Sequence, residues 1–197
     1  MRTVTYGAAC SLDGFIDAAD GALDWLHFSP DVQDVMAKYW ATVDTILMGR
    51  KTWEVAVAMG GGGESCDGGV MAPDTRTYVF SRTLTDVAQP GVHLVREDAG
   101  AFVQALKQKS GRGICVMGGG DLARSLLEAG VIDKVELNVH PVLLGSGTPL
   151  FLDAGRRIKL ALQRSRALDG GCVLSTYKVL GSRSAARKSG KRRKPDG

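Results

Sequence analysis

The sequence predicts one α/β domain built on a mostly parallel sheet, with helices on both faces and an antiparallel hairpin at its end. Short apolar segments of strand length alternate with segments of helical periodicity along most of the chain. Two late strand-like segments meet at Asp169-Gly170-Gly171, which is typical of a β-hairpin. A length of 197 residues suits a single domain, residues 1–180, followed by a tail, residues 181–197.

Each element has a local reason in the sequence. Alternating or continuous apolar runs predict strands at residues 3–10, 45–48, 77–81, 92–95, 113–117, 134–140, 160–168 and 172–179. Helices are expected from Ser29 onward and at residues 51–59, 101–109 and 121–129. Ser29 and Pro30 suit the N-cap and first position of a helix, and Gly130 suits a helix end. The apolar residues of the first helix recur on one face: Val32, Val35, Met36, Tyr39 and Trp40.

The charge is distributed unevenly. The net charge is +4, but residues 181–197 hold seven bases and one acid, which leaves 18 bases and 20 acids in residues 1–180. The domain itself therefore gives no indication of specific nucleic-acid binding, although a disordered basic tail could bind weakly. No apolar run is long enough to span a membrane. The four cysteines have neither CxxC nor metal-ligand spacing, so we expect no metal site and a cytoplasmic protein.

Glycine accounts for 26 residues, and its placement is informative. The apolar run 114–117 leads into Gly118, Gly119 and Gly120 and then into a helix that starts near Asp121. Bare glycines let a phosphate approach the backbone, and a helix N-terminus attracts anions. The alternative is a tight strand–helix turn that needs glycine only for packing. The stretch from the run Gly60–Gly63 through Gly68 and Gly69 has too little apolar content to pack. Because the glycine run has no anchoring residue, we interpret this surface loop as a linker or flap.

A second strand–helix turn carries positive charge. Gly49 follows the apolar run 46–48, and Arg50, Lys51 and Thr52 open the next helix. A guanidinium fork beside an ammonium group would suit a phosphomonoester, although a solvated surface pair explains the same residues. Ser81 and Arg82 end a third strand with a hydroxyl and another cation.

These turns resemble a known superfamily. The segment Met48-Gly49-Arg50-Lys51-Thr52-Trp53-Glu54, followed some 65 residues later by the triple glycine, resembles dihydrofolate reductase. Residues 11–16 and 140–151 are similar to the pyrimidine reductase branch of riboflavin biosynthesis, without its deaminase domain. The resemblance covers about residues 2–180. It implies a mixed eight-stranded sheet, a reductase of a pterin- or pyrimidine-like small molecule, NADPH as hydride donor, and a homodimer.

The resemblance also implies roles for individual residues. The NADPH site would comprise Gly49, Arg50, Lys51, Thr52, Ser81, Arg82, Gly118, Gly119, Gly120 and Asp121. The segment 11–25 would act as a mobile lid over nicotinamide and substrate, with Ser11, Asp13 and Trp25. Asn138 could face the substrate.

A carboxylate near the start of the first helix would help protonate the substrate, as in folate reductases. Asp31 occupies that place, and Asp34 lies one turn further along. Stabilisation of the helix N-terminus explains Asp31 equally well. The alternative to an enzyme is a nucleotide-binding module without turnover.

Overall fold

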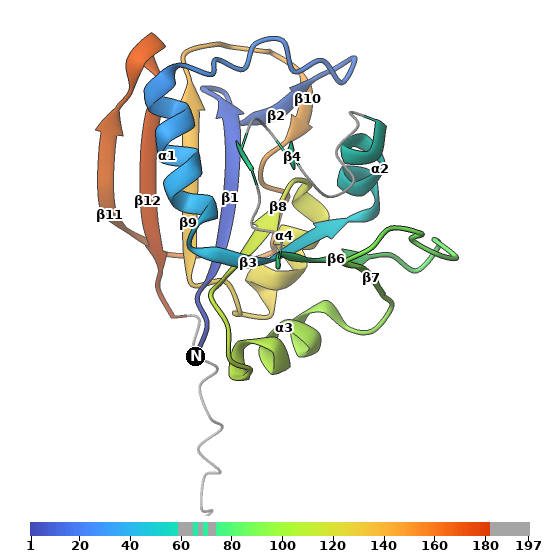
Figure 1. Ribbon diagram of the computed structural model, residues 1–197. Helices are drawn as coiled ribbons and strands as arrows, with labels where there is room; N and C mark the ends of the chain where they lie inside the picture. Colours follow the sequence, from blue (N-terminus) through green and yellow to red (C-terminus); the bar gives the residue numbers. More distant parts are fainter. Residues whose placement is uncertain (59–64, 67–68, 71–73, 182–197) are drawn as a thin grey trace, which may run out of the picture.

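The computed structural model describes residues 1–58, 65–66, 69–70 and 74–181. Its centre is the expected eight-stranded, mostly parallel sheet, with the strand order β11-β12-β9-β1-β8-β3-β6-β7 (Figure 1). The basic tail beyond residue 181 and the run Gly60–Gly63 lie outside the described residues. In the part that is described, no helix has the length and apolar character needed to cross a membrane.

Six neighbouring strands of the sheet run parallel. They are β1 (Val4–Ser11), β3 (Val43–Gly49), β6 (Arg76–Phe80), β7 (Val92–Val95), β8 (Gly113–Met117) and β9 (Lys134–His140). The predicted hairpin, β11 (Leu160–Ala167) and β12 (Val173–Val179), adds to β9 in the antiparallel sense. The carboxyl ends of the parallel strands therefore lie along one edge of the sheet, where ligands bind in open α/β folds.

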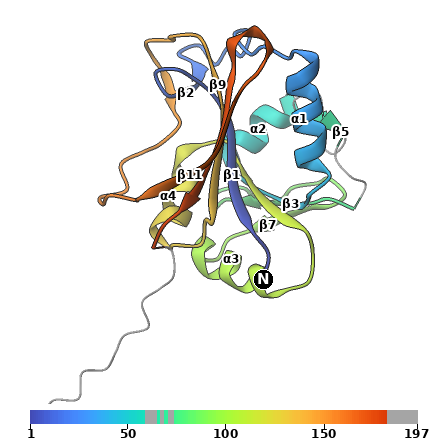
Figure 2. The same cartoon turned by 90° about the vertical axis from the view of Figure 1, so that its left-hand side faces the viewer.

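Helices cover both faces, as Figure 2 shows. The helices α1 (Pro30–Trp40) and α2 (Arg50–Ala58) pack on one face, and α3 (Ala99–Gln108) and α4 (Gly120–Glu128) pack on the other. Successive side chains of β1 point to opposite faces of the sheet, so this strand contributes to the packing on both faces. Val4 and Tyr6 are fully buried in the core beneath α3 and α4, whereas Gly7 and Ala9 point to the α1 side and line a cavity there.

Two differences from the expected elements have clear physical causes. Helix α3 begins at Ala99 rather than at residue 101, because the Asp98 carboxylate caps it by accepting a hydrogen bond from the Ala101 N–H at 2.8 Å. A second small sheet joins β2 (Phe15–Ala18) to β10 (Gly147–Pro149) in the antiparallel sense. Its strands lie about 130 residues apart in the chain, so no local sequence pattern predicts that they pair.

A third small sheet lies in a stretch that the sequence indicates as loop. The two-residue strands β4 (Ser65–Cys66) and β5 (Gly69–Val70) pair antiparallel there. Ser65, Cys66 and Gly69 of the expected loop are therefore paired strand residues.

Candidate active site

The three strand–helix turns that the sequence singles out lie side by side at the carboxyl edge of the sheet. Strand β3 has β8 as one neighbour and β6 as the other, with Met48 opposite Met117 and Gly49 opposite Phe80. The turn with Arg50, the turn with Ser81 and the glycine turn therefore follow adjacent strand ends. Residues from positions 49 to 121 are brought into one surface region by the sheet order.

Thr52 joins two of these turns. Its hydroxyl accepts a hydrogen bond from the backbone N–H of Gly119 at 3.2 Å. Gly118 adopts a positive φ of 73°, and a Cβ at that position would collide with the Thr52 side chain. The glycine at 118 is thus required both by its backbone conformation and by the close approach of Thr52.

The remaining glycines of the turns fall into two kinds. A Cβ at Gly120 would lie 2.8 Å from Leu152 Cγ, so packing alone demands glycine there. Gly49 and Gly119 have negative φ; a Cβ on Gly49 would meet nothing within 4 Å, and one on Gly119 would meet only Thr52 Oγ1 at 3.8 Å. Neither protein packing nor backbone conformation requires glycine at these two positions. Bare backbone facing open space suits a ligand that approaches the main chain closely.

The charged side chains around the turns are exposed and loosely held. The Arg50 guanidinium forms two hydrogen bonds to Glu54, at 2.7 and 2.9 Å, on the surface of α2. Lys51 and Arg82 are exposed. The Ser81 hydroxyl accepts from the N–H groups of Thr83 and Leu84 and shapes its own turn.

Asp121 belongs to the first turn of α4. Its carboxylate pairs with Arg124 at 3.3 Å and is largely exposed. The carboxylate is therefore directed along the helix. Of the groups of Asp121, only the backbone N–H could bind an anion at this helix end.

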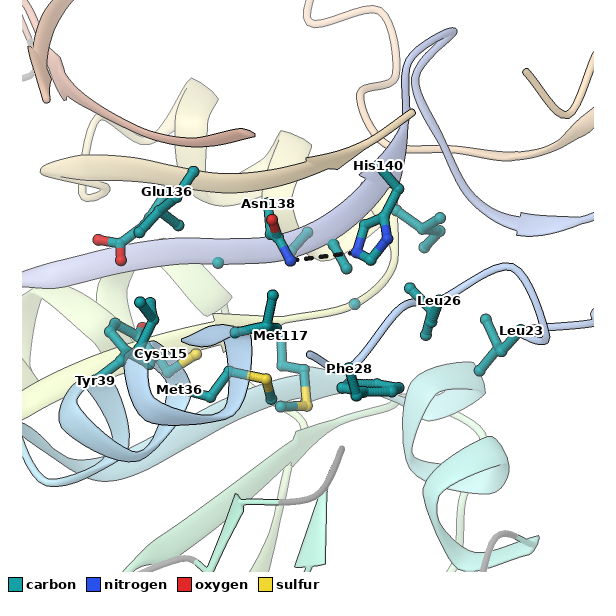
Figure 3. Close-up of a pocket in the computed structure, with 18 of the residues that line it drawn as sticks. Leu23, Leu26, Phe28, Met36, Tyr39, Cys115, Met117, Glu136, Asn138 and His140 are labelled. Carbon is teal, nitrogen blue, oxygen red and sulfur yellow. Dashed lines mark hydrogen bonds between the residues drawn. The ribbon is translucent and has the colours of Figure 1, made fainter. Parts of the chain in front are cut away.

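A cavity of about 430 Å³ lies between α1 and the sheet and extends to these turns (Figure 3). Thr52 and Gly118 line it at the end next to the glycine turn. The small residues Gly7 and Ala9 of β1 make room beneath α1, whose predicted apolar face forms much of the opposite wall. Most of the lining is apolar, and the volume is that of a small-molecule site.

Polar side chains on β9 form one wall of this cavity. Glu136, Asn138 and His140 alternate along the strand and lie in a row above Met36, Met117 and Phe28 in Figure 3. Burial raises the pKa of the Glu136 carboxyl above its ordinary value. Asn138 was expected to face the substrate, and the structure places it in the lining.

The sequence reasoning missed Glu136 and His140 as site residues. The available signal was the strict alternation of polar Glu136, Asn138 and His140 with apolar Val135 and Leu137 in a strand next to the centre of the sheet. Polar side chains on a buried strand need hydrogen-bond partners, which either a ligand or other buried polar groups can supply.

The structure places Asp31 and Asp34 away from the cavity lining. The Asp31 carboxylate accepts hydrogen bonds from the Ser29 hydroxyl and, at 2.9 Å, from the backbone N–H of Asp169. These bonds lower its pKa, the Ser29 bond most strongly. Asp31 therefore fastens the start of α1 to the turn between β11 and β12. Asp34 is exposed and pairs with Lys38 at 2.6 Å.

The expected lid is tied down along its first half. Ser11 donates a hydrogen bond to Asp13 at 2.6 Å, and Asp13 accepts from the backbone N–H groups of Leu144 and Gly145 at 3.2 and 2.7 Å. Strand β2 then pairs with β10. Trp25, further along, packs edge-on against His140, with ring centroids 5.3 Å apart. These contacts join residues 11–18, which we call the cap, to the segment around β10.

Comparison with known proteins agrees with this arrangement. Residues 2–174 match the RibD C-terminal domain family. The Bacillus subtilis protein YyaP is 31% identical over 181 residues, which cover 90% of this chain and 95% of YyaP. YwjB of the same organism is 33% identical over 171 residues, 84% of this chain and 91% of its own. Neither relative's name states an activity.

Solved structures show the same fold. A Shewanella sp. PV-4 protein, whose name connects it with riboflavin biosynthesis, superposes with a TM-score of 0.77 at 27% identity, covering 91% of this chain and 99% of its own. A Thermotoga maritima deaminase and 5-amino-6-(5-phosphoribosylamino)uracil reductase gives a TM-score of 0.68 at 15% identity over 90% of this chain and 56% of that one. Dihydrofolate reductase from Enterococcus faecalis, complexed with NADP(H), gives 0.62 at 15% identity over 90% and 96%. The chain has the dihydrofolate reductase-like fold and belongs to the RibD C-terminal domain family.

Proposed function

We propose that this protein is an NADPH-dependent reductase that transfers hydride to a pterin- or pyrimidine-like small molecule. The observation that carries the proposal is the position of Thr52 and Gly118. Both belong to the turns expected to hold the cofactor, and both line the cavity. A dinucleotide held on those turns therefore has direct access to the cavity, where a second molecule can meet it.

The turns fit a dinucleotide in three respects. Gly49 and Gly119 leave open backbone where phosphates could approach. The N-terminus of α4 follows Gly119, and no side chain caps it in the part of the chain that the structure describes, so its first backbone N–H groups are available to an anion. Arg50 is held only by an exposed pair with Glu54, which contributes little to stability and so leaves the guanidinium available to a phosphomonoester.

The other residues expected at the cofactor would complete this site. Lys51 and Arg82 would supply further positive charge, and Ser81 would hold its turn in shape. When bound, NADPH supplies the hydride.

Glu136 is the carboxyl group best placed to hold a proton for the substrate. It lines the cavity, and burial raises its pKa toward the range in which a carboxyl group can donate a proton near neutral pH. Asp31 and Asp34, which the sequence indicated for this role, have no access to the cavity lining described above. Glu136 therefore takes the role in the proposed reaction.

The segment that joins β2 to α1 would exclude water from the reacting groups. Trp25 closes over His140, and Leu23, Leu26 and Phe28 line the cavity from the segment that joins β2 to α1 (Figure 3). An apolar cover of this kind lowers the local dielectric and strengthens the polar contacts made on β9.

A homodimer also belongs to the proposal. Edge strand β11 leaves Leu160 and Leu162 exposed, at 42% and 59%, and these side chains offer apolar surface for a second copy. Sedimentation of the full chain would measure this separately from activity.

The proposed function is tested by titrating the full chain with NADPH and NADH and by following NADPH oxidation with dihydropterins and ribosylaminopyrimidines. NADPH should bind at least tenfold more tightly than NADH, and Arg50→Ala should remove most of that preference because the guanidinium meets the extra phosphate. Arg157→Ala, at an exposed arginine outside the turns, is the matched control. Absence of NADPH binding would refute the proposal, and binding without oxidation of NADPH would favour a nucleotide-binding module without turnover.

A further inference from the structure

The charge of the cavity points to the class of substrate. None of the described residues that line it is lysine or arginine. The only ionisable side chains in the lining that could carry a charge near neutral pH are Glu136 and His140. The chain between residues 59 and 73 adds no base, since its charged residues are Glu64 and Asp67. A phosphate ester placed among these residues would find no cation to neutralise it.

His140 cannot replace the missing cation. Its Nδ1 lies 3.3 Å from the backbone nitrogen of His27, and its Nε2 lies 3.2 Å from the amide nitrogen of Asn138 (Figure 3). Both of these neighbours are hydrogen-bond donors, and Nδ1 also lies 3.4 Å from the Cys172 sulfur. A neutral ring can accept one of these bonds, whereas a protonated ring has no lone pair left for either. Burial, followed by the charge of His27, lowers the pKa of His140 in the same direction.

The nearest bases do not supply a phosphate site. Lys134 and Arg164 act on the Glu136 carboxylate electrostatically, but neither belongs to the cavity lining. Arg50 and Lys51 lie at the cofactor turns and are likewise absent from the lining. Among the described residues, the positive charge near the cavity thus lies outside its lining, and Arg50 and Lys51 lie at the end where the proposed NADPH phosphates would bind.

The polar side chains of β9 favour a ligand that carries hydrogen-bond donors. Glu136 offers carboxylate oxygens, and the amide oxygen of Asn138 is buried without a hydrogen-bond partner among the described residues. Two acceptors two residues apart on one strand suit a ligand edge that carries N–H groups. The opposite wall is apolar, with Met36, Met117 and Phe28, and suits the face of a ring.

Resting on the proposed reductase function, we infer that the substrate is a phosphate-free, neutral or cationic heterocycle that presents an edge of N–H groups to Glu136 and Asn138. The cavity selects against phosphate esters of the same ring system, because their charge would be desolvated beside a carboxylate with no cation in the lining. The absence of a cation is thus a specificity device of this cavity.

Matched pairs of compounds that differ only by one phosphate test the inference. Suitable pairs are 5-amino-6-ribosylaminouracil with its 5′-phosphate, and 6-hydroxymethyl-7,8-dihydropterin with its monophosphate. Binding to the full chain is measured by calorimetry at saturating NADPH. The phosphate-free member should bind at least ~10-fold more tightly in any pair that binds. Tighter binding of a phosphate ester, or no binding by either phosphate-free compound, would overturn the inference.

Two substitutions sharpen the test. Val35→Lys places a cation on the cavity wall formed by α1 and should raise affinity for the phosphate esters, whereas Leu180→Lys at the exposed position after β12 should not. Glu136→Gln keeps the shape of the side chain and removes the charge of its ionised form, so the discrimination against phosphate, measured above the raised pKa of Glu136, should shrink several-fold. An unchanged ratio in both cavity variants would contradict the electrostatic reason.

NADPH affinity, measured alone, separates the two proposals. If NADPH fails to bind, the reductase function fails. If NADPH binds normally but phosphate esters are preferred, only the substrate class fails.

Discussion

The Thr52 hydroxyl accepts a hydrogen bond from the backbone N–H of Gly119, and this bond joins the turn after β3 to the turn after β8. The two turns are 67 residues apart in the chain. Their positions relative to each other decide whether phosphates held by one turn can also reach the other.

Replacing Thr52 with valine should weaken NADPH binding without unfolding the protein. Valine keeps the shape of the side chain but cannot accept from Gly119, and loss of one such bond costs about 1 kcal/mol. We expect Kd for NADPH to rise roughly 3–10-fold. Thr52→Ser keeps the hydroxyl and is the control. Unchanged NADPH affinity in Thr52→Val together with weaker binding in Thr52→Ser would show that packing of the Thr52 methyl group, and not the bond, matters.

Two glycines of the turn after β8 should be needed for different reasons, Gly119 for ligand binding and Gly120 for packing. Gly119→Ala has room in the protein, so Tm should change little while NADPH affinity falls at least ~10-fold. Gly120→Ala presses on Leu152 and should lower Tm by roughly 3–10 °C. Thermal unfolding with and without NADPH measures both effects. Unchanged NADPH affinity in Gly119→Ala would mean that no phosphate approaches that backbone.

Asp13 should make the cap sensitive to acid. The hydrogen bond from Ser11, followed by those from Gly145 and Leu144, holds the pKa of Asp13 below its ordinary value. Its tether is therefore complete above the ordinary carboxyl pKa of about 4 and is lost as pH falls through the lowered value. Relative to its intrinsic rate, hydrogen exchange at the amides of Leu144 and Gly145 should become faster as the pH falls through the lowered pKa of Asp13, below about pH 4.

Asp13→Asn keeps the shape of the side chain but removes the charge that these amides meet. The variant should show the faster exchange already at neutral pH. Wild-type exchange rates in the variant would show that the carboxylate does not hold the cap.

Glu136 and the two helix carboxylates should differ in their effect on turnover. Glu136→Gln removes the group that would hold the proton, so kcat should fall by about 10²-fold or more. Asp34→Asn should leave kcat/KM within about twofold, because its side chain is exposed and paired with Lys38. Asp31→Asn should lower Tm and leave kcat of the folded protein nearly unchanged, since Asp31 fastens α1 to the hairpin turn.

The pH profile offers an independent check on Glu136. Because burial raises its pKa, the protonated form persists to higher pH than for an ordinary carboxyl group. Wild-type kcat should therefore fall as pH rises through that raised pKa, and Glu136→Gln should lack this limb. If the fall of kcat at high pH were lost in Asp31→Asn and kept in Glu136→Gln, Asp31 and not Glu136 would be the proton donor.

The sequence by itself determined the elements and predicted the cofactor end of the proposed site. Apolar periodicity located the eight strands of the main sheet, and glycine, arginine and hydroxyl residues marked three strand ends. These signals are local, because a strand end, a bare glycine and a helix start are neighbours in the chain. The family resemblance supplied their common purpose.

Only the tertiary structure decided the substrate end. Whether Asp31, Asp34 or Glu136 reaches the cavity depends on how α1 rotates against the sheet and on which side of β9 each residue falls. Likewise, β2 meets β10 and Asp13 meets Leu144 across more than 125 residues of chain. Such contacts arise from packing between distant segments, and the absence of a cation from the cavity is visible only after those segments are brought together.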